Sequence, residues 1–317
     1  MRKILLSVAL IAMMVSCNNE ETNPVEDANA VMVTERQCAS DDVLQEQMRQ
    51  DPGLAQRMTD IENFTEMALK AGRLVNGQIE IPVVVNVLYS SSAENISLAQ
   101  IQSQIDVLNQ DFNGQNTDFN QVPTTFSGAK ANVGISFVLE TVNRKSTRKT
   151  SWGTRDTMKN AKRGGIDATS PDTKLNLWVC TIGGGILGYA QFPGGSPSTD
   201  GVVIDSRYFG TTGTATYPFN KGRTATHEVG HWLNLRHIWG DTTCGNDQVN
   251  DTPSHNTANY GCPSYPHYST CSGSPIEMTM NYMDYTDDAC MYMFSNGQKD
   301  RMLATFAPGG PRSSFAQ

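Results

Sequence analysis

The chain has little histidine, no excess of positive charge and few long apolar runs. It contains five histidines in 317 residues, and 24 Lys and Arg against 32 Asp and Glu, which leaves a net charge of −8. This acidic balance argues against nucleic-acid binding. We find no internal repeat, no C-x-x-C pair, and no segment after the first sixteen residues that is apolar enough to cross a membrane. Because histidine is so scarce, a group of histidines in one stretch is informative.

Three of the five histidines stand in the single stretch HEVGHWLNLRH. On a helix, residues four apart share one face, so His227 and His231 can bind the same metal ion. Glu228 follows the first histidine and can reach a water molecule on that metal. His237 lies too far beyond His231 to share this face, so the chain must turn to bring it back. The turn needs a positive φ, which Asn234 adopts more readily than most non-glycine residues.

Three neutral imidazoles and one water form an open tetrahedral zinc site, the catalytic type. Zinc lowers the pKa of the bound water and polarises a scissile carbonyl. Glu228 takes the water's proton and later gives it to the leaving amine. The plain alternative is a chance occurrence of the motif on an amphipathic helix. A second alternative makes Asp241 or Glu277 the third ligand, as in other zincin clans, with a cell-wall amide as the substrate.

A second motif lies downstream, where Met280 to Tyr285 read MNYMDY. A methionine turn beneath a three-histidine zinc site marks the metzincin clan. With DDACMYMF, the closing QKDRM, and the upstream strings LNLWVC and LGYAQFP, the chain resembles the pappalysin family of metzincins from Ile79 to Phe306. It departs from the family pattern at Asn234, where glycine is usual.

The resemblance implies an α+β, metzincin-like catalytic domain of two lobes over residues 77–317. The upper lobe, residues 77–234, would hold a twisted mixed sheet, a backing helix and the zinc-binding helix. The lower lobe, residues 235–317, would be irregular and disulfide-braced, and would contain the Met-turn and a final helix.

The residue pattern predicts the individual elements of this domain. Ser97 caps a helix that runs to Phe112, and Ser295 caps the final helix. Runs of β-branched and apolar residues predict strands at Ile79–Tyr89, Ile135–Glu140, Leu175–Cys180 and Val202–Asp205. In metzincins the segment equivalent to Ile186–Ala190 is an edge strand of the cleft, where an extended peptide pairs its backbone.

Two residues of the Met-turn receive roles from the resemblance. It implies that Met283 forms the hydrophobic floor beneath the metal. Tyr285 resembles the metzincin tyrosine that approaches the zinc and stabilises the oxyanion of the tetrahedral intermediate. The alternative for Tyr285 is a tyrosine packed in the core.

Four cysteines, Cys244, Cys262, Cys271 and Cys290, follow the histidine motif. Four cysteines in an exported protein indicate two disulfides, and three pairings are possible. A zinc knuckle is the alternative, but an oxidising compartment disfavours it. The resemblance implies the pairs Cys244–Cys271 and Cys262–Cys290, which would brace the Met-turn segment.

An oxygen-rich loop in the same region suits calcium. It contains Asp247, Asn250, Asp251 and Thr252 and does not match an EF-hand. The resemblance implies a calcium site at this loop, and the alternative is a polar turn.

The N-terminal residues predict export. Residues 1–16 combine Arg2 and Lys3 with a short apolar run, which is typical of a signal peptide. They end in a lipobox-like string before Cys17, which would be lipidated and would anchor the chain to a membrane. An ordinary signal peptide with an incidental cysteine is the alternative.

Residues 17–76 differ from the rest and are predicted to be a polar tether and a pro-segment, with helical spacing over Val43–Leu69. We expect Cys38 to bind the zinc in a latent form, as in pappalysin pro-segments, with Arg36 favouring its thiolate. A disulfide to Cys180 or an idle thiol is the alternative. Cleavage near Arg73 would remove the segment and release the enzyme from its lipid.

Two charged features bear on substrate choice. Residues 143–163 hold eight basic residues and one acid, which indicates either a solvated face or docking of an acidic pro-segment or substrate. Some bacterial pappalysins favour a basic residue just after the cut by means of an acid in the pocket, and Asp287 and Asp288 stand near that place.

The sequence as a whole predicts an exported zinc endopeptidase made as a latent zymogen. Its partners are protein or peptide substrates and, through Cys17, a membrane, with no nucleic acid and a monomeric catalytic domain. We expect the precursor at the cell envelope and the mature enzyme to be released from it. The alternatives are a non-catalytic, zinc-containing surface lipoprotein module, which Glu228 argues against because a structural site needs no base, and the cell-wall amidase.

Overall fold

The computed structural model describes residues 33–72 and 77–315. The predicted signal segment, Cys17 and the cleavage near Arg73 lie outside the described residues. No helix in the described ranges has both the length and the apolar character needed to span a membrane. The helices are α1 (Ser40–Gln50), α2 (Leu54–Lys70), α3 (Leu98–Phe112), α4 (Arg223–Trp232) and α5 (Asn296–Ala304), and the strands are β1 (Ile79–Tyr89), β2 (Ile135–Ser146), β3 (Leu175–Cys180), β4 (Gly188–Ala190) and β5 (Val202–Asp205).

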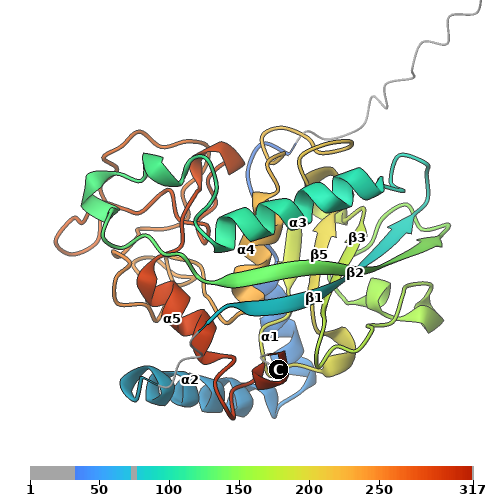
Figure 1. Cartoon of the computed structure of the whole chain (residues 1–317), viewed down its shortest axis with the longest axis horizontal. Helices are drawn as coiled ribbons and strands as arrows, with labels where there is room; N and C mark the ends of the chain where they lie inside the picture. Colours follow the sequence, from blue (N-terminus) through green and yellow to red (C-terminus); the bar gives the residue numbers. More distant parts are fainter. Residues whose placement is uncertain (1–32, 73–76, 316–317) are drawn as a thin grey trace, which may run out of the picture. The chain divides into compact units, whose positions relative to one another are not determined.

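The five strands form one mixed sheet in the order β2-β1-β3-β5-β4 (Figure 1). The first four are parallel to their neighbours, and β4 runs antiparallel to β5 at the edge. The central strands β1 and β3 are apolar and buried on both faces, as parallel strands usually are. The α+β fold class and the edge position of β4 are as predicted.

Helices α3 and α4 cover one face of the sheet. Ile101, Ile105 and Leu108 of α3 share a buried cluster with Val83 of β1 and Val229 of α4. Their spacing of three and four residues places them on one side of α3, and Ser97 caps this helix by accepting a hydrogen bond from the backbone of Gln100. Helix α4 is therefore held against the sheet by an apolar core.

The other face of the sheet packs against two separate segments. Trp178 and Val203 on this face lie in a cluster with Trp152 and Met158, and with Val43 of α1. The N-terminal part of the chain therefore contributes to the core at this face.

Two predicted elements have different limits in the structure. The expected helix over Val43–Leu69 is two helices, because Pro52 disfavours helical geometry at Asp51, whose backbone is extended. Strand β2 continues past Glu140 to Ser146, since Glu140 forms a bulge and pairing with β1 resumes beyond it. The apolar pattern ends at Glu140 because β2 is an edge strand, where polar residues are tolerated.

The segment between α4 and α5 has no helix longer than a single turn. Two disulfides, Cys244–Cys271 and Cys262–Cys290, cross it as the resemblance implied. At its end, Ser295 caps α5 with the predicted geometry and forms a capping box with Gln298.

Candidate metal centre

Helix α4 carries the first two histidines and is buried along its whole length. At its start, Arg223 pairs with Asp111 of α3 at 3.1 Å, and Thr226 donates a hydrogen bond to the same carboxylate at 2.7 Å. These contacts fix both the position and the rotation of α4, and with them the direction of its histidines.

Each of the three motif histidines is oriented through its Nδ1 atom. His227 Nδ1 lies 2.7 Å from the Tyr282 carbonyl, His231 Nδ1 lies 2.8 Å from the Leu235 carbonyl, and His237 Nδ1 contacts the Asp241 carboxylate. These oxygens only accept hydrogen bonds, so Nδ1 carries the proton in each ring and Nε2 presents a lone pair. Asp241 therefore positions His237.

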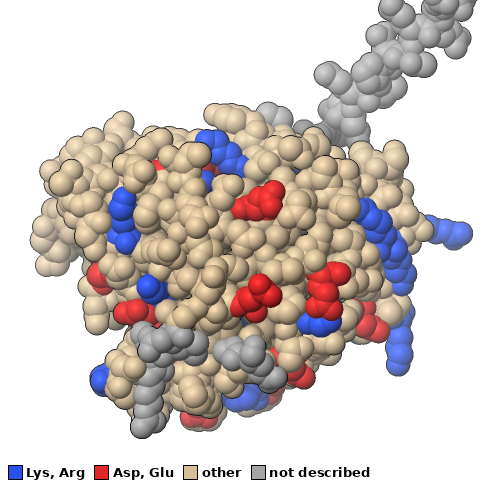
Figure 2. Space-filling model, in the orientation of Figure 1, with Lys and Arg blue, Asp and Glu red and all other residues tan. Residues whose placement is uncertain are grey.

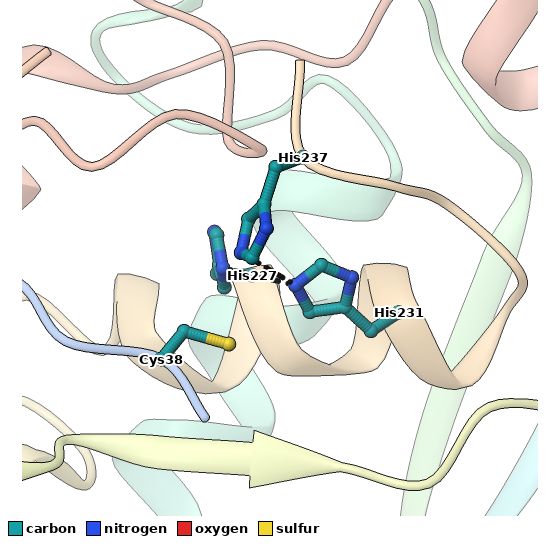
Figure 3. Close-up of side chains that lie close together, drawn as sticks. All are labelled: Cys38, His227, His231 and His237. Carbon is teal, nitrogen blue, oxygen red and sulfur yellow. Dashed lines mark hydrogen bonds between the residues drawn. The ribbon is translucent and has the colours of Figure 1, made fainter. Parts of the chain in front are cut away.

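The three Nε2 atoms converge on one point (Figure 3). His231 Nε2 lies 3.2 Å from that of His227 and 3.1 Å from that of His237. Nitrogens bound tetrahedrally to one zinc ion stand about 3.3 Å apart, so the donor set fits zinc. Burial and the neighbouring imidazoles hold the pKa of His227 well below its ordinary value, and lower the pKa of His231 to about 3. Both rings are therefore neutral, as a metal ligand must be.

The turn after α4 has the geometry that the sequence predicted. Asn234 has φ of 71°, and its backbone carbonyl accepts a 2.8 Å hydrogen bond from buried Arg301. Leu235 then donates back to the Gly230 carbonyl at 3.0 Å, which ends the helix. In the described part of the chain the buried Asn234 amide nitrogen has no hydrogen-bond partner, so the side chain itself contributes no bond to this turn.

Met283 lies beneath helix α4 at Gly230. In the sequence, Gly230 stands between the first two motif histidines. A Cβ atom on Gly230 would stand 2.5 Å from the Met283 sulfur, so only glycine allows this contact. Met283 is fully buried, and its carbonyl accepts a 3.1 Å hydrogen bond from Ile238 on the chain that leads away from His237. Met283 therefore packs directly against the helix segment that carries His227 and His231.

Cys38 completes the cluster. Its sulfur and the three histidine nitrogens all lie within 4.8 Å of one another, and Figure 3 shows the thiol directed at the imidazoles from a separate segment. The thiol donates to Glu228 at 3.3 Å, and the Ser40 hydroxyl donates to the same carboxylate oxygen at 2.8 Å. Cys38 and Cys180 are both free, so the alternative disulfide between them is excluded.

The expected effect of Arg36 on the Cys38 thiol is wrong. The Arg36 guanidinium turns away and pairs with Asp288 at 2.6 Å in a buried pocket, over the ring of Phe219. With no cation beside it, burial together with Glu228 raises the pKa of the Cys38 thiol well above its ordinary value. Only a metal ion at the centre would favour the thiolate.

The chain around Cys38 pairs with the edge strand. The backbone of Ala39 donates to Gly188 at 3.1 Å, and Leu187 donates to Gln37 at 2.9 Å. The bridge between Cys38 and Gly188 is parallel. The edge that was expected to bind a substrate therefore holds residues of the chain's own N-terminal part.

Tyr285 lies beside the three histidines and not in a remote core. Its hydroxyl donates to the Cys38 carbonyl at 3.1 Å, and its ring is 4.9 Å from that of His237. Trp239, which the sequence analysis did not single out, stacks on His237 at 4.3 Å and also contacts Tyr285. No sequence motif marks Trp239, because its contacts with His237 and Tyr285 depend on how the loop folds.

Only some of the oxygen atoms in the oxygen-rich loop lie close together. The Thr252 hydroxyl lies 2.8 Å from Asp247 and 3.0 Å from the Val249 carbonyl, so three kinds of oxygen converge there. Asp251 turns away and accepts hydrogen bonds from Ser295 and Gly297 at the start of α5. Within the described residues, the Asn250 side chain forms no hydrogen bond with the other three.

The rival third ligands do not reach the centre. Asp241 contacts the outer nitrogen of His237. Glu277 is buried elsewhere, where it accepts hydrogen bonds from Asn256 and Asn259. His237 occupies the position that either acid would have taken.

Comparison with known proteins agrees with this geometry. Residues 180–307 match the family described as pregnancy-associated plasma protein-A. An extracellular metalloprotease of Pyricularia oryzae is 38% identical over 71% of this chain and 72% of its own length. The chain belongs to the pappalysin family. It is accordingly a zinc metalloendopeptidase.

Solved pappalysin structures resemble the chain over most of its length. Mature mirolysin of Tannerella forsythia with a cleaved peptide is 45% identical and covers 76% of this chain and 97% of its own, with a TM-score of 0.73. A mutant of promirolysin from the same organism is 43% identical and covers 89% of this chain and 97% of its own, with a TM-score of 0.81.

Proposed function

We propose that the chain is an exported zinc endopeptidase made as a latent precursor, with zinc held by His227, His231 and His237. The observation that carries this proposal is the convergence of three Nε2 lone pairs beside Glu228 and Cys38. Relatives named extracellular metalloproteases support export. Lipid attachment at Cys17 with later release remains part of the proposal.

In the reaction, zinc when bound polarises the scissile carbonyl and acidifies the attacking water. Glu228 takes the proton of that water and delivers it to the leaving amine. While residues 33–72 cover Glu228, burial raises its pKa to about 7, and Ser40 and Cys38 donate hydrogen bonds to its carboxylate. The Tyr285 hydroxyl donates a hydrogen bond to the oxyanion of the tetrahedral intermediate.

Residues 33–72 form the inhibitory part of a pro-segment, and residues 77–317 are the catalytic domain. The promirolysin match covers 89% of the chain and the mature mirolysin match covers 76%, and the difference is about the length of residues 33–72. Cys38 occupies the fourth position around the three histidines, and Ser40 and Cys38 both hydrogen-bond the base Glu228. Cleavage near Arg73 removes the Cys38 sulfur from the histidines and both hydrogen bonds from Glu228.

The cleft favours a basic residue next to the cut. Arg36, two residues from the zinc-facing Cys38, lies in a buried pocket whose carboxylate is Asp288. Its guanidinium also donates to the Thr286 carbonyl and to Thr224. A substrate arginine or lysine takes this pocket once Arg36 has left. Asp287, by contrast, stands at the partly exposed rim and carries no ion pair among the described residues.

A calcium ion braces the loop of Asp247 and Thr252. The support is the convergence of the Asp247 carboxylate, the Val249 carbonyl and the Thr252 hydroxyl. Burial raises the pKa of Asp247 to about 6, and a bound cation would favour its ionised form.

The test is a cleavage profile of the chain purified without its leader, after processing, with and without a zinc chelator. We expect cleavage before arginine and lysine that the chelator abolishes and added zinc restores. Asp288→Asn should reduce the preference for a basic residue about tenfold or more, while Asp287→Asn serves as the matched control. Chelator-resistant cleavage, or equal effects of the two variants, would contradict the proposal.

Latency has its own test, because the described residues contain a second free cysteine, Cys180. The Cys38→Ala precursor should process itself at least about tenfold faster than wild type, since one zinc ligand is lost. Cys180→Ala is the control, since Cys180 is buried in β3 away from the centre. Should both precursors stay as silent as wild type, steric blocking by the pro-segment is the better account.

A further inference from the structure

A large groove lies on the other side of Cys38 from the Asp288 pocket. Its volume is about 900 Å³, and one wall is α1, which begins two residues after Cys38. The opposite wall is the segment from Thr154 to Pro171, which follows β2. The pro-segment therefore meets a closed pocket at Arg36 and an open groove after Ser40.

The body wall of this groove presents two cations without acidic partners. Arg155 and Arg163 are exposed and line the groove, and neither forms an ion pair within the described ranges. They belong to the basic stretch of residues 143–163. Figure 2 shows lysine and arginine side chains gathered along the right-hand edge, over the far end of β2 and the segment after it.

The acids on the same wall do not neutralise these two arginines. Asp156 pairs with buried Lys159 at 2.9 Å and accepts a hydrogen bond from the Tyr189 hydroxyl. Asp167 accepts a hydrogen bond from the backbone of Ala161. Arg155 and Arg163 are therefore free to bind an anionic group that enters the groove.

The pro-segment wall has the complementary charge. Asp42 and Glu46 of α1 and Asp51 after it line the groove. Arg49 pairs with Glu46 and Arg57 pairs with Asp51, so this wall keeps a net negative charge through Asp42. Hydrogen bonds from Arg49 and Gln50 hold the pKa of Glu46 below its ordinary value, and Arg155 contributes to this from across the groove. The two walls attract each other without a direct ion pair.

The groove continues the line of the edge strand. Gln191 follows β4 directly, and its side-chain oxygen accepts a 3.3 Å hydrogen bond from Gln47 of α1. Gln47 also donates to Asp156 at 3.4 Å. An extended peptide paired with β4 passes Ala190 and then enters the groove that α1 borders in the precursor.

We propose that this groove is an extended substrate subsite in which Arg155 and Arg163 bind acidic side chains of the substrate. These acids lie on the side of the scissile bond opposite to the basic residue held at Asp288. The inference rests on the proposed protease function and deepens it. In the precursor the acids of α1 occupy the mouth of the groove, so the same charges serve latency first and substrate binding afterwards.

The matched control comes from the same basic stretch. Arg148 and Lys162 are exposed cations within residues 143–163, but they do not line the groove. A general attraction of acidic peptides to a solvated basic face would be weakened equally by the loss of either pair. Specific binding in the groove depends on Arg155 and Arg163 alone.

The experiment compares processed enzyme on two fluorogenic peptides with the same basic residue at the cut. One peptide carries aspartate and glutamate, and the other alanine, on the side of the cut away from the basic residue. We expect wild type to prefer the acidic peptide about tenfold in kcat/KM, through two partly exposed ion pairs. Arg155→Ala/Arg163→Ala should bring this ratio close to one, and Arg148→Ala/Lys162→Ala should leave it unchanged.

Four other outcomes are distinct. A ratio of one in wild type, or equal losses in both double variants, would overturn the groove and leave the protease intact. A third peptide carries its acids on the same side as the basic residue, and the same preference for it would also overturn the groove. If none of the peptides is cleaved, the proposed protease function itself fails.

Discussion

Residues 77–234 contain every strand of the sheet together with α3 and α4, whereas residues 235–295 contain turns, bridges and one short 3-10 segment. The first part places His227, His231 and Glu228 on one regular helix. The second part supplies His237, Met283 and Tyr285 from loops. Both parts must be equally well ordered, because all of these side chains meet at one centre.

The loop part achieves order without repeated backbone pairing. Buried side chains take the place of ladder hydrogen bonds: Asn259 donates to Glu277 at 2.7 Å and to Asp284 at 3.0 Å, and His255 accepts from the backbone of Met278 at 2.9 Å. Two disulfides close loops of similar length over the same region. The comparison shows that a regular helix orients its side chains by its periodicity. In a loop, each side chain needs a separate contact to hold it in place.

The largest expected effect lies in the regular part. Glu228→Ala should leave the three zinc ligands in place and lower kcat by about 10² to 10⁴-fold, the usual scale for general acid–base catalysis. Zinc content and kcat of the processed variant check this. A variant with full zinc and near-normal turnover would rule out the role of Glu228.

The next effect concerns the loop part, where the two disulfides form a matched pair. Removing either with two serines should cost about 3 kcal/mol of stability, because the closed loops span 27 and 28 residues. Only the Cys262–Cys290 loop contains Met283, so only Cys262→Ser/Cys290→Ser should also weaken zinc retention. Thermal unfolding and zinc content together measure this, and equal zinc loss in both variants would contradict it.

The junction between the two parts comes third. Asn234→Val should destabilise the protein by about 2 kcal/mol, since a β-branched residue is strained at φ of 71°. Asn234→Gly should be tolerated, because glycine adopts this φ freely and the Asn234 amide nitrogen makes no hydrogen bond in the described residues. Urea unfolding of both variants decides it; equal stabilities would show that the turn geometry is unimportant.

The smallest expected effect is that of calcium on the loop part. Saturating calcium at fixed zinc should raise stability by about 1 kcal/mol, because it binds only the folded loop. Asp247→Asn should abolish the calcium-dependent shift in melting temperature. The control is Asp251→Asn, whose carboxylate caps α5; it should lower stability and keep the shift. An unchanged melting temperature of the wild type counts against the site.

Sequence reasoning succeeded where local rules apply. The four-residue spacing of His227 and His231, the positive φ of Asn234, and the caps at Ser97 and Ser295 are all in the structure. Each depends on residues within about one helical turn, so helix periodicity and capping geometry are enough to predict it. The predicted end of β2 at Glu140 was too early, because an edge strand needs no apolar pattern once a long partner such as β1 is present.

Only the tertiary structure decided which distant groups meet. Cys38 lies 190 residues from Glu228, and Arg36 lies 252 residues from Asp288. From the sequence, Arg36 was expected to help the thiol near it in the chain, but its guanidinium pairs with Asp288. Cys38 reaches the centre, and Arg36 reaches the Asp288 pocket. The sequence alone determined the zinc-binding motif, because its spacing is local; the fold decided what blocks it, because those contacts depend on how separate elements pack.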